Sequence, residues 1–286
     1  MECKIGIVIA ASYNPGIIAN HVTNQKRRNL EMKVGILAGG LGTRLSEETT
    51  IKPKPMVEIG GKPILWHIMK IYSSFGFHEF VIALGYKGEL IKQYFLNYHY
   101  LVHNLTIDLG NNQIRVNDGD DDPWIVHLLD TGLNTNTGGR VKEIAQFVGN
   151  ESFMLTYGDG VDNINLSRLL ETHRRLHRLV TVTAVHPPAR FGEIIFDREL
   201  ASGFAEKPQI GDGWINGGFF VLEPEIMNYI DDNQTLWEGE PMEKFVKEKQ
   251  LATYKHDGFW QCMDSLRDVR TLENLWNEGK APWKIW

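Results

Sequence analysis

Glycines and basic side chains meet in one short stretch of the sequence, and together they could bind phosphate. Three glycines within residues 39–42 follow the apolar run 33–38, and Arg44 and Lys54 come shortly after them. Glycines let backbone N–H groups come close to phosphate oxygens. An arginine grips a phosphate with a planar fork, and a lysine acts as a point charge. Since Lys54 lies between two prolines that stiffen its backbone, the pattern predicts a polyphosphate site.

Two better-known phosphate-binding patterns do not fit this stretch. A dinucleotide-binding fingerprint would need glycine at position 45, which is Leu45, so a Rossmann oxidoreductase is disfavoured. The chain also has no G-x-x-x-x-G-K-[ST] motif, which argues against a P-loop ATPase. The alternative without function is a tight turn between a strand and a helix, followed by a solvated basic turn.

Several motifs spread over most of the chain carry a resemblance to one family. They begin with Gly39-Gly40-Leu41-Gly42-Thr43-Arg44-Leu45 and extend over Met32 to Trp286, through residues 52–57, 157–160, 206–208, 216–218 and 260–264. Together they resemble the sugar-1-phosphate nucleotidyltransferases. Many members carry proline where this chain has Ser46. Residues 46–49, 60–67 and 281–284 instead look like the glucose-1-phosphate cytidylyltransferase branch. The resemblance implies a Rossmann-like nucleotidyltransferase fold.

The resemblance also implies an activity, the transfer of a cytidylyl group from CTP to α-D-glucose 1-phosphate, which gives CDP-glucose and pyrophosphate. A thymidylyl- or uridylyltransferase acting on a hexose 1-phosphate stays open, because base choice depends on backbone groups in loops. A non-catalytic nucleotide-sensing module is a further alternative. Such a module is expected to have lost a charged group of the site, whereas the charged residues at 44, 54, 159, 207 and 264 are all present. Mg²⁺ as cofactor, a homo-oligomer and a product used in lipopolysaccharide or O-antigen synthesis are further implications.

The chemistry of this reaction sets what the side chains must do. The attacking phosphate is already ionised at neutral pH, so catalysis consists of positioning and charge neutralisation. We expect Arg44, Lys54 and Asp159 to carry catalysis. Asp159 and Asp264 would bind Mg²⁺ through hard carboxylate oxygens, as matching positions do in the family. The alternatives without function are a turn residue for Asp159 and a helix cap before Ser265 for Asp264.

Further substrate contacts follow from the resemblance. Lys207 would bind the sugar phosphate, and Asn216 and Gly217 would lie near the hexose. Thr135 and Arg140 would contact the nucleotide; alternatively, Thr137 caps a helix and Arg140 faces solvent. The full set of expected binding residues is Leu37, Ala38, Gly39, Gly40, Leu41, Gly42, Thr43, Arg44, Lys54, Thr135, Arg140, Gly158, Lys207, Asn216 and Gly217.

The elements that must position these residues alternate between two kinds of apolar pattern. Strands are expected at residues 33–38, 80–84, 124–130, 153–157, 180–185 and 214–222. Helices are expected at residues 63–75, 89–95, 139–148, 165–177 and 266–276. This alternation predicts an α/β fold with a mixed, mostly parallel sheet and helices on both faces. Residues 110–123 are expected to form a solvated loop, and His173 and His177 to lie on a solvated helix face.

Composition limits the partners and the compartment. The 286 residues include 36 acidic and 30 basic side chains, a net charge of -6, which argues against a nucleic-acid partner. No apolar run reaches the ~18–20 residues of a membrane span. Cys3 and Cys262 cannot form a multi-bridge framework, so a cytoplasmic location is expected. Residues 1–31 show no strong periodicity and are predicted to be an N-terminal extension of unknown role, before a nucleotidyltransferase domain at 32–286.

Overall fold

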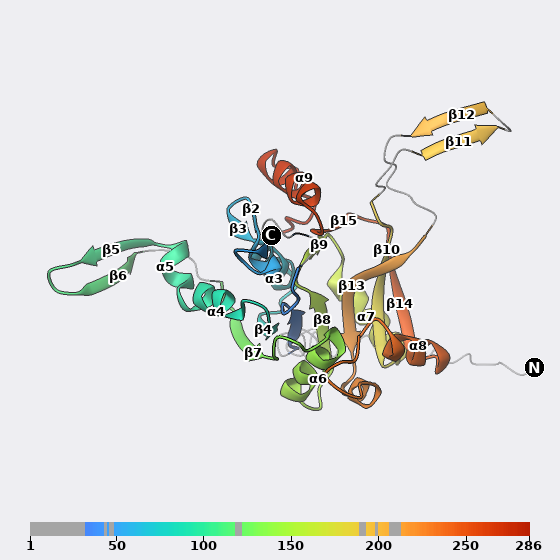
Figure 1. The fold of residues 1–286 in the computed structure, drawn as a ribbon, viewed down its shortest axis with the longest axis horizontal. Helices are drawn as coiled ribbons and strands as arrows, with labels where there is room; N and C mark the ends of the chain where they lie inside the picture. The colour runs from blue at the N-terminus through green and yellow to red at the C-terminus, as the bar shows by residue number, and fades with distance from the viewer. Residues whose placement is uncertain are drawn as a thin grey trace, which may run out of the picture.

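The computed structural model describes residues 32–42, 45, 49–117, 122–188, 193–197, 200–205 and 213–286 (Figure 1). The predicted extension at residues 1–31 lies outside the described residues, so its role stays a prediction. Three expected site residues, Thr43, Arg44 and Lys207, also lie outside them.

A seven-stranded sheet in the order β14-β10-β13-β8-β1-β4-β7 forms the centre of the fold. Four neighbouring pairs are parallel, and β13 runs antiparallel to both of its neighbours, β10 and β8. The predicted mixed, mostly parallel sheet is therefore confirmed. The strands are β1 Val34–Leu37, β4 Glu79–Leu84, β7 Ile125–Asp130, β8 Phe153–Tyr157, β10 Val180–Val185, β13 Ile215–Leu222 and β14 Leu251–His256.

Helices cover both faces of this sheet, as predicted. Val34 and Ile36 of β1 belong to a core shared with α3 and α7, whereas Leu37 belongs to a second core shared with α6 and α8. Among the described residues, none of the helices has the length and apolar character needed to cross a bilayer. The helices are η2 Lys54–Met56, α3 Ile64–Ser74, α4 Gly88–Leu96, α5 Tyr98–Val102, α6 Thr137–Val148, α7 Leu166–Leu176, η3 Pro224–Tyr229, α8 Glu240–Lys247 and α9 Leu266–Asn277.

The last residues of the chain pack onto α3 through His67. Trp283 is fully buried, and its indole Nε1 donates to Nδ1 of His67 at 3.3 Å. The other ring nitrogen, Nε2, lies 2.8 Å from the carbonyl oxygen of Ile59 and must donate to it. Burial lowers the pKa of His67 to about 4, so the ring is neutral at physiological pH. The neutral imidazole on α3 thus links the C-terminal segment to the backbone of Ile59.

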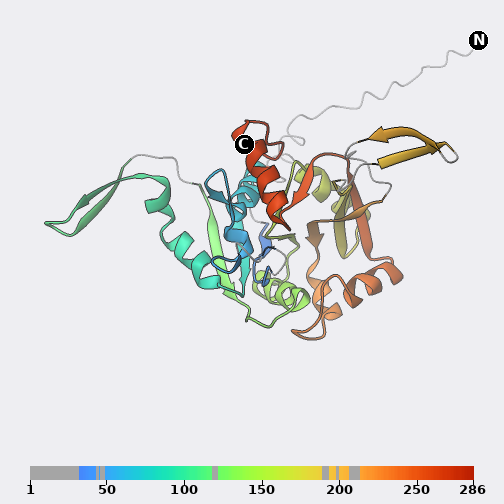
Figure 2. The same ribbon diagram turned by 45° about the horizontal axis from the view of Figure 1, so that its top comes forward.

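In the part of the chain that the structure describes, four two-stranded ribbons accompany the main sheet. Two of them project from opposite ends of the molecule, the β5–β6 hairpin and the β11–β12 ribbon (Figures 1 and 2). The prediction of a loop over residues 110–123 is wrong for residues 113–117, which form β6. The ribbons are β2 Glu58–Ile59 with β3 Lys62–Pro63, β5 Asn104–Asp108 with β6 Gln113–Asn117, β9 Gly160–Asp162 with β15 Trp260–Cys262, and β11 Glu193–Asp197 with β12 Leu200–Ala205.

The predicted solvated face of α7 is wrong for His173. This side chain is 3% exposed, and its ring nitrogens lie 2.8 Å from Thr181 Oγ1 and 3.0 Å from Glu223 Oε1. Both partners are contributed by the surface that α7 packs against, so His173 belongs to the interior of the domain.

Candidate functional site

The candidate site lies where the strand order changes direction. β1 pairs with β4 on one side and with β8 on the other. Segment 38–42 follows β1, and Gly158 follows β8, donating from its backbone N–H to the carbonyl oxygen of Leu37 at 3.0 Å. A Cβ at Gly158 would lie 2.8 Å from that oxygen and 3.0 Å from Cγ of Pro55, so only glycine fits. Ligands of open α/β sheets bind at such a switch point, beyond the carboxyl ends of the strands.

Three of the expected site residues meet at this point. Nζ of Lys54 lies 2.6 Å from Oδ2 of Asp159 and 2.6 Å from Oδ1 of Asp264. The three side chains are 13%, 29% and 21% exposed. Burial alone would lower the pKa of Lys54, but the charges and hydrogen bonds of the two carboxylates outweigh it and raise that pKa above 10.5. Lys54 is therefore a cation that joins two carboxylates distant in the sequence.

A short ribbon positions both carboxylates. β9 begins directly after Asp159, β15 ends two residues before Asp264, and the backbone N–H of Met263 donates to the carbonyl oxygen of Asp159 at 2.8 Å. The N-cap of α9 is Ser265, which forms a capping box with Asp268. The alternative interpretation of Asp264 as a helix cap is therefore wrong, and its carboxylate contacts Lys54 instead.

The two carboxylates fit a divalent cation that shares its coordination with a substrate. Mg²⁺ prefers oxygen ligands and is usually held by one or two carboxylates together with phosphates and water. Asp159 and Asp264 supply such oxygens within reach of one ammonium group. Within the described ranges, no group of three or more His, Cys, Asp or Glu side chains could form a complete protein cage. The donor set thus suits a metal bound together with a polyphosphate.

Arg140 binds the backbone of the glycine loop, residues 38–42. Its side chain is 3% exposed, and its guanidinium donates to the carbonyl oxygens of Leu84 at 2.8 Å and Gly39 at 3.2 Å. A Cβ at Gly39 would overlap this guanidinium, whereas a Cβ at Gly40 would meet no atom within 4 Å. The alternative in which Arg140 faces solvent is wrong, because the side chain is buried and bound to the backbone of the loop.

The turn after β4 also binds the chain around the glycine loop, and the sequence analysis did not predict this contact. The backbone N–H of Tyr86 donates to the carbonyl oxygen of Gly39 at 3.2 Å, and its hydroxyl donates to that of Thr49, also at 3.2 Å. Nζ of Lys87 donates to the carbonyl oxygens of Thr50 and Ile51. The turn therefore contacts the chain on both sides of residues 43–48. The glycines that flank Tyr86 and Lys87 were the available signal.

The expected nucleotide-side segment is held by a loop far along the chain. Residues 134–138 bond to residues 232–238, which we call the strap. The backbone N–H of Asn136 donates to the carbonyl oxygen of Asn233 at 2.8 Å, and that of Gly138 donates to Thr235 at 3.0 Å. Thr135 turns back on its own segment and donates to the carbonyl oxygen of Thr131 at 2.5 Å. The N-cap of α6 is Asn136 rather than the alternative, Thr137.

The expected sugar-side residues lie on β13, next to the end of β8. Asn216 is exposed, and its Nδ2 donates to the hydroxyl of Tyr157 at 3.3 Å. Gly217 is buried, and a Cβ there would lie 2.7 Å from Cγ1 of Val185. Tyr157 was not predicted as a site residue, although it directly precedes the Gly158-Asp159 motif. Asn216 therefore lies beside the strand end that leads to Asp159.

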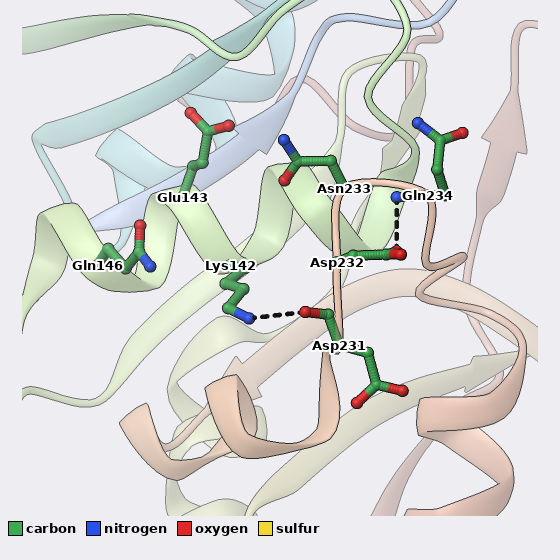
Figure 3. Close-up of a pocket in the computed structure, with 7 residues that line it drawn as sticks. All are labelled: Lys142, Glu143, Gln146, Asp231, Asp232, Asn233 and Gln234. Carbon is green, nitrogen blue, oxygen red and sulfur yellow. Dashed lines mark hydrogen bonds between the residues drawn. The ribbon is translucent and has the colours of Figure 1, made fainter.

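A polar cavity of about 650 Å³ lies between α6 and the strap (Figure 3). None of the expected site residues lines it, and Nζ of Lys142 is bound to the backbone oxygens of Ile230 and Asp231. The lining residues are Lys142, Glu143, Gln146, Asp231, Asp232, Asn233 and Gln234. This cavity is therefore separate from the meeting point of Lys54 and the two carboxylates.

The chain is similar to known proteins over most of its length. The chain is 50% identical over 257 residues to the glucose-1-phosphate cytidylyltransferase of Salmonella typhi, covering 89% of this chain and 100% of that protein. It is 44% identical over 256 residues to a probable glucose-1-phosphate cytidylyltransferase of Bacillus subtilis, with the same coverage.

A solved structure and a family model complete the comparison. HddC from Yersinia pseudotuberculosis superimposes with a TM-score of 0.62 at 22% identity, covering 86% of this chain and 99% of that one, which supports the fold. The model of the nucleotidyl transferase family matches residues 33–281. The protein therefore belongs to the nucleotidyl transferase family.

Proposed function

We propose that the protein transfers a cytidylyl group from CTP to α-D-glucose 1-phosphate, giving CDP-glucose and pyrophosphate. The observation that carries this proposal is the Lys54 ammonium between Asp159 and Asp264 at the switch point of the sheet. This arrangement offers a cation for a triphosphate and oxygens for its metal ion. The similarity to glucose-1-phosphate cytidylyltransferases supports the choice of base and sugar.

In the proposed reaction, a phosphate oxygen of glucose 1-phosphate attacks the α-phosphorus of CTP. A new P–O bond forms, the bond from the α-phosphorus to the bridging oxygen of the β-phosphate breaks, and pyrophosphate leaves with the electron pair. No proton has to be removed from the nucleophile. Asp159 and Asp264 would hold Mg²⁺, which supplies charge neutralisation at the α-phosphate when it is bound. Arg44 and Lys54 would neutralise the triphosphate oxygens as charge builds up on the leaving group.

We assign the substrate contacts by the same reasoning. Backbone groups of residues 37–43 and of Gly158 would approach the phosphates, with Arg140 supporting the loop that carries them. Thr135 would lie on the nucleotide side. Lys207, Asn216 and Gly217 would lie on the sugar side.

The test is a matrix of CTP, dTTP and UTP against glucose 1-phosphate and other hexose 1-phosphates, read by pyrophosphate release. CTP with glucose 1-phosphate is expected to give the highest kcat/KM. A clear preference for dTTP or UTP would replace the cytidylyltransferase by the thymidylyl- or uridylyltransferase alternative. Nucleotide binding without pyrophosphate release from any pair would favour a nucleotide-sensing module.

We further infer that the protein is a homo-oligomer and that the β5–β6 hairpin contacts a second copy. An isolated two-stranded hairpin is at best marginally stable in water. This hairpin nevertheless projects from the body of the molecule (Figure 1). Ile107, Leu109 and Ile114 are 57%, 89% and 53% exposed. A second copy that covers these side chains would provide the burial that the hairpin lacks.

Sedimentation of the purified protein tests this assembly. Replacing Ile107, Leu109 and Ile114 by threonine should lower the sedimenting mass, whereas Val246→Thr, which changes an exposed apolar residue on α8, should not. A monomeric unmodified protein would refute the inference.

Removal of residues 1–31 should leave the activity intact, since we assign catalysis to residues 32–286. A cytoplasmic location and a role in lipopolysaccharide or O-antigen synthesis remain expectations.

A further inference from the structure

A continuous line of hydrogen bonds runs from β13 to the strap. The backbone N–H of Gly218 donates to Oδ1 of Asn216 at 2.8 Å, and Nδ2 of Asn216 donates to the hydroxyl oxygen of Tyr157 at 3.3 Å. The Tyr157 hydroxyl in turn donates to Oε1 of Glu238 at 2.6 Å. The residue assigned to the hexose is thus connected to a carboxylate that lies outside the predicted site.

A second line reaches the same carboxylate from the nucleotide side. The backbone N–H of Trp237 donates to Oγ1 of Thr137 at 2.9 Å, and the Thr137 hydroxyl donates to Oε2 of Glu238 at 2.7 Å. Thr137 begins α6, directly after the segment that carries Thr135. Glu238 therefore accepts one hydrogen bond from each half of the candidate site.

The direction of every bond in these lines is fixed by chemistry. Backbone N–H groups can only donate, and carboxylate oxygens can only accept. Because Gly218 donates to Asn216, the carboxamide must turn its oxygen toward Gly218 and its nitrogen toward Tyr157. The Tyr157 oxygen then accepts, and its proton must point to Glu238. Because Glu238 accepts the Tyr157 proton, the hydrogen bonds of Gly218, Asn216 and Tyr157 can all form in one set of directions.

The backbone at Glu238 is held rigidly. The neighbouring Trp237 is fully buried and packs against Phe220 and Phe245, with ring centroids 6.1 Å and 5.8 Å away. The strap also lies so close to α6 that a Cβ at Gly138 would be 2.6 Å from the carbonyl oxygen of Thr235. Glu238 is exposed to solvent, but its position depends on this buried anchor.

We propose that Glu238 is a positioning residue for the sugar phosphate. Glu238 acts through Tyr157 and fixes the orientation of the Asn216 carboxamide. In that orientation the amide nitrogen uses one N–H for Tyr157 and keeps the second for an acceptor oxygen of the hexose. Without the carboxylate, the Tyr157 proton can turn toward Asn216 and drive the carboxamide to flip, which breaks its bond to Gly218. This inference rests on the proposed function, because it takes Asn216 as a hexose contact.

Steady-state kinetics of three variants test the proposal. Glu238→Ala removes both acceptors and should raise KM for glucose 1-phosphate about 3- to 10-fold, the worth of one hydrogen bond, with kcat and KM for CTP nearly unchanged. Glu238→Gln removes the charge but keeps an oxygen for Tyr157, while its amide can donate to Thr137. This variant should therefore stay within about twofold of the unmodified protein. Glu240→Ala, which removes a carboxylate paired with Lys244 on α8, is the matched control and should change neither KM.

A double-mutant cycle with Tyr157→Phe separates positioning from a general loss of structure. Tyr157→Phe removes the oxygen that accepts from Asn216 Nδ2, so the carboxamide loses the partner through which Glu238 acts. This variant should also raise KM for the sugar phosphate, and Glu238→Ala should add nothing in that background. Equal effects of the Ala and Gln variants, or an unchanged KM in both Glu238→Ala and Tyr157→Phe, would overturn the inference.

The same series distinguishes this inference from the proposed function. It is run with whichever nucleotide and hexose 1-phosphate the unmodified protein uses best in the substrate matrix. An active protein with a flat Glu238 series overturns only the positioning role. A protein that releases no pyrophosphate from any pair overturns both.

Discussion

Replacing Lys54 by methionine tests the centre of the site directly. The change leaves an unbranched side chain one atom shorter and removes the ammonium that contacts Asp159 and Asp264 at 2.6 Å each. The two carboxylates would then face each other without a counter-charge. Both are held in place by the β9–β15 ribbon and cannot move far apart without breaking its backbone hydrogen bonds. The variant should therefore be less stable than the unmodified protein in the absence of metal.

The expected decrease in the free energy of unfolding of Lys54→Met lies between two limits. Exposed ion pairs contribute about 0.2–1 kcal/mol, whereas removing one partner of a buried pair costs about 3–5 kcal/mol. The three side chains are 13%, 29% and 21% exposed, so water still screens part of the repulsion. We expect Lys54→Met to lower the free energy of unfolding by about 2–3 kcal/mol.

The assay is urea unfolding at low ionic strength with a metal chelator present. Lys52→Met is the matched control, because Lys52 pairs with Glu58 at 3.1 Å where the two side chains are 28% and 52% exposed. That loss should stay below about 1 kcal/mol. Added Mg²⁺ should stabilise Lys54→Met more than the unmodified protein, since the metal replaces the missing charge.

The pH dependence gives an independent check of Lys54. Its pKa is raised in the folded protein, so its stabilising contribution is fully present below pH 10.5 and is lost only as the pH rises through the raised value. The difference between Lys54→Met and the unmodified protein should therefore be constant around neutral pH. Loss of less than about 0.5 kcal/mol in Lys54→Met would refute the assignment of Lys54 as the group that holds the carboxylates together.

Three further predictions concern the glycine loop, the C-terminal contact and the metal. Gly39→Ala should cost about 1–3 kcal/mol in unfolding free energy because its Cβ would overlap the Arg140 guanidinium, and equal stability of Gly39→Ala and Gly40→Ala would contradict this account. The pKa of His67 is lowered from 6.5 to about 4, so the unfolded chain binds a proton first and stability falls as the pH drops through that window, by about 3 kcal/mol in all. His67→Gln should flatten the curve of unfolding free energy against pH between these values, and an unchanged slope would speak against a buried neutral ring. Asp159→Asn should lower kcat about 100-fold or more while the midpoint of thermal unfolding changes little, which pyrophosphate release and calorimetry would measure.

Much of the main sheet could be predicted from the sequence. β8 has the predicted bounds, because the apolar run 153–157 ends sharply at Gly158. α7 begins and ends within one residue of its prediction, since Asn165 caps it and an apolar stripe repeats at helical spacing. The convergence of Lys54, Asp159 and Asp264 also follows the prediction, because sharp turns and prolines marked these positions and the family resemblance linked them.

The remaining features depend on contacts that local patterns do not contain. The β9–β15 ribbon pairs three residues with three, which is too short to show periodicity. His173 stands next to two arginines, yet it is buried against Glu223, which lies 50 residues further along the chain. Arg140 could be placed under the glycine loop only once the positions of β4 and α6 were known. The strap is polar and looks like an ordinary loop in the sequence.

The β9–β15 ribbon has a consequence for how the enzyme is made. All seven strands of the main sheet are already present in a nascent chain that reaches His256, but β15, Asp264 and α9 are not. A ribosome that stops there releases a polypeptide with the glycine loop and Lys54 but with a single carboxylate. Under the proposed mechanism such a product lacks one of the two carboxylates that would hold the metal ion, so the site is complete only after the chain has been synthesised through Asp264.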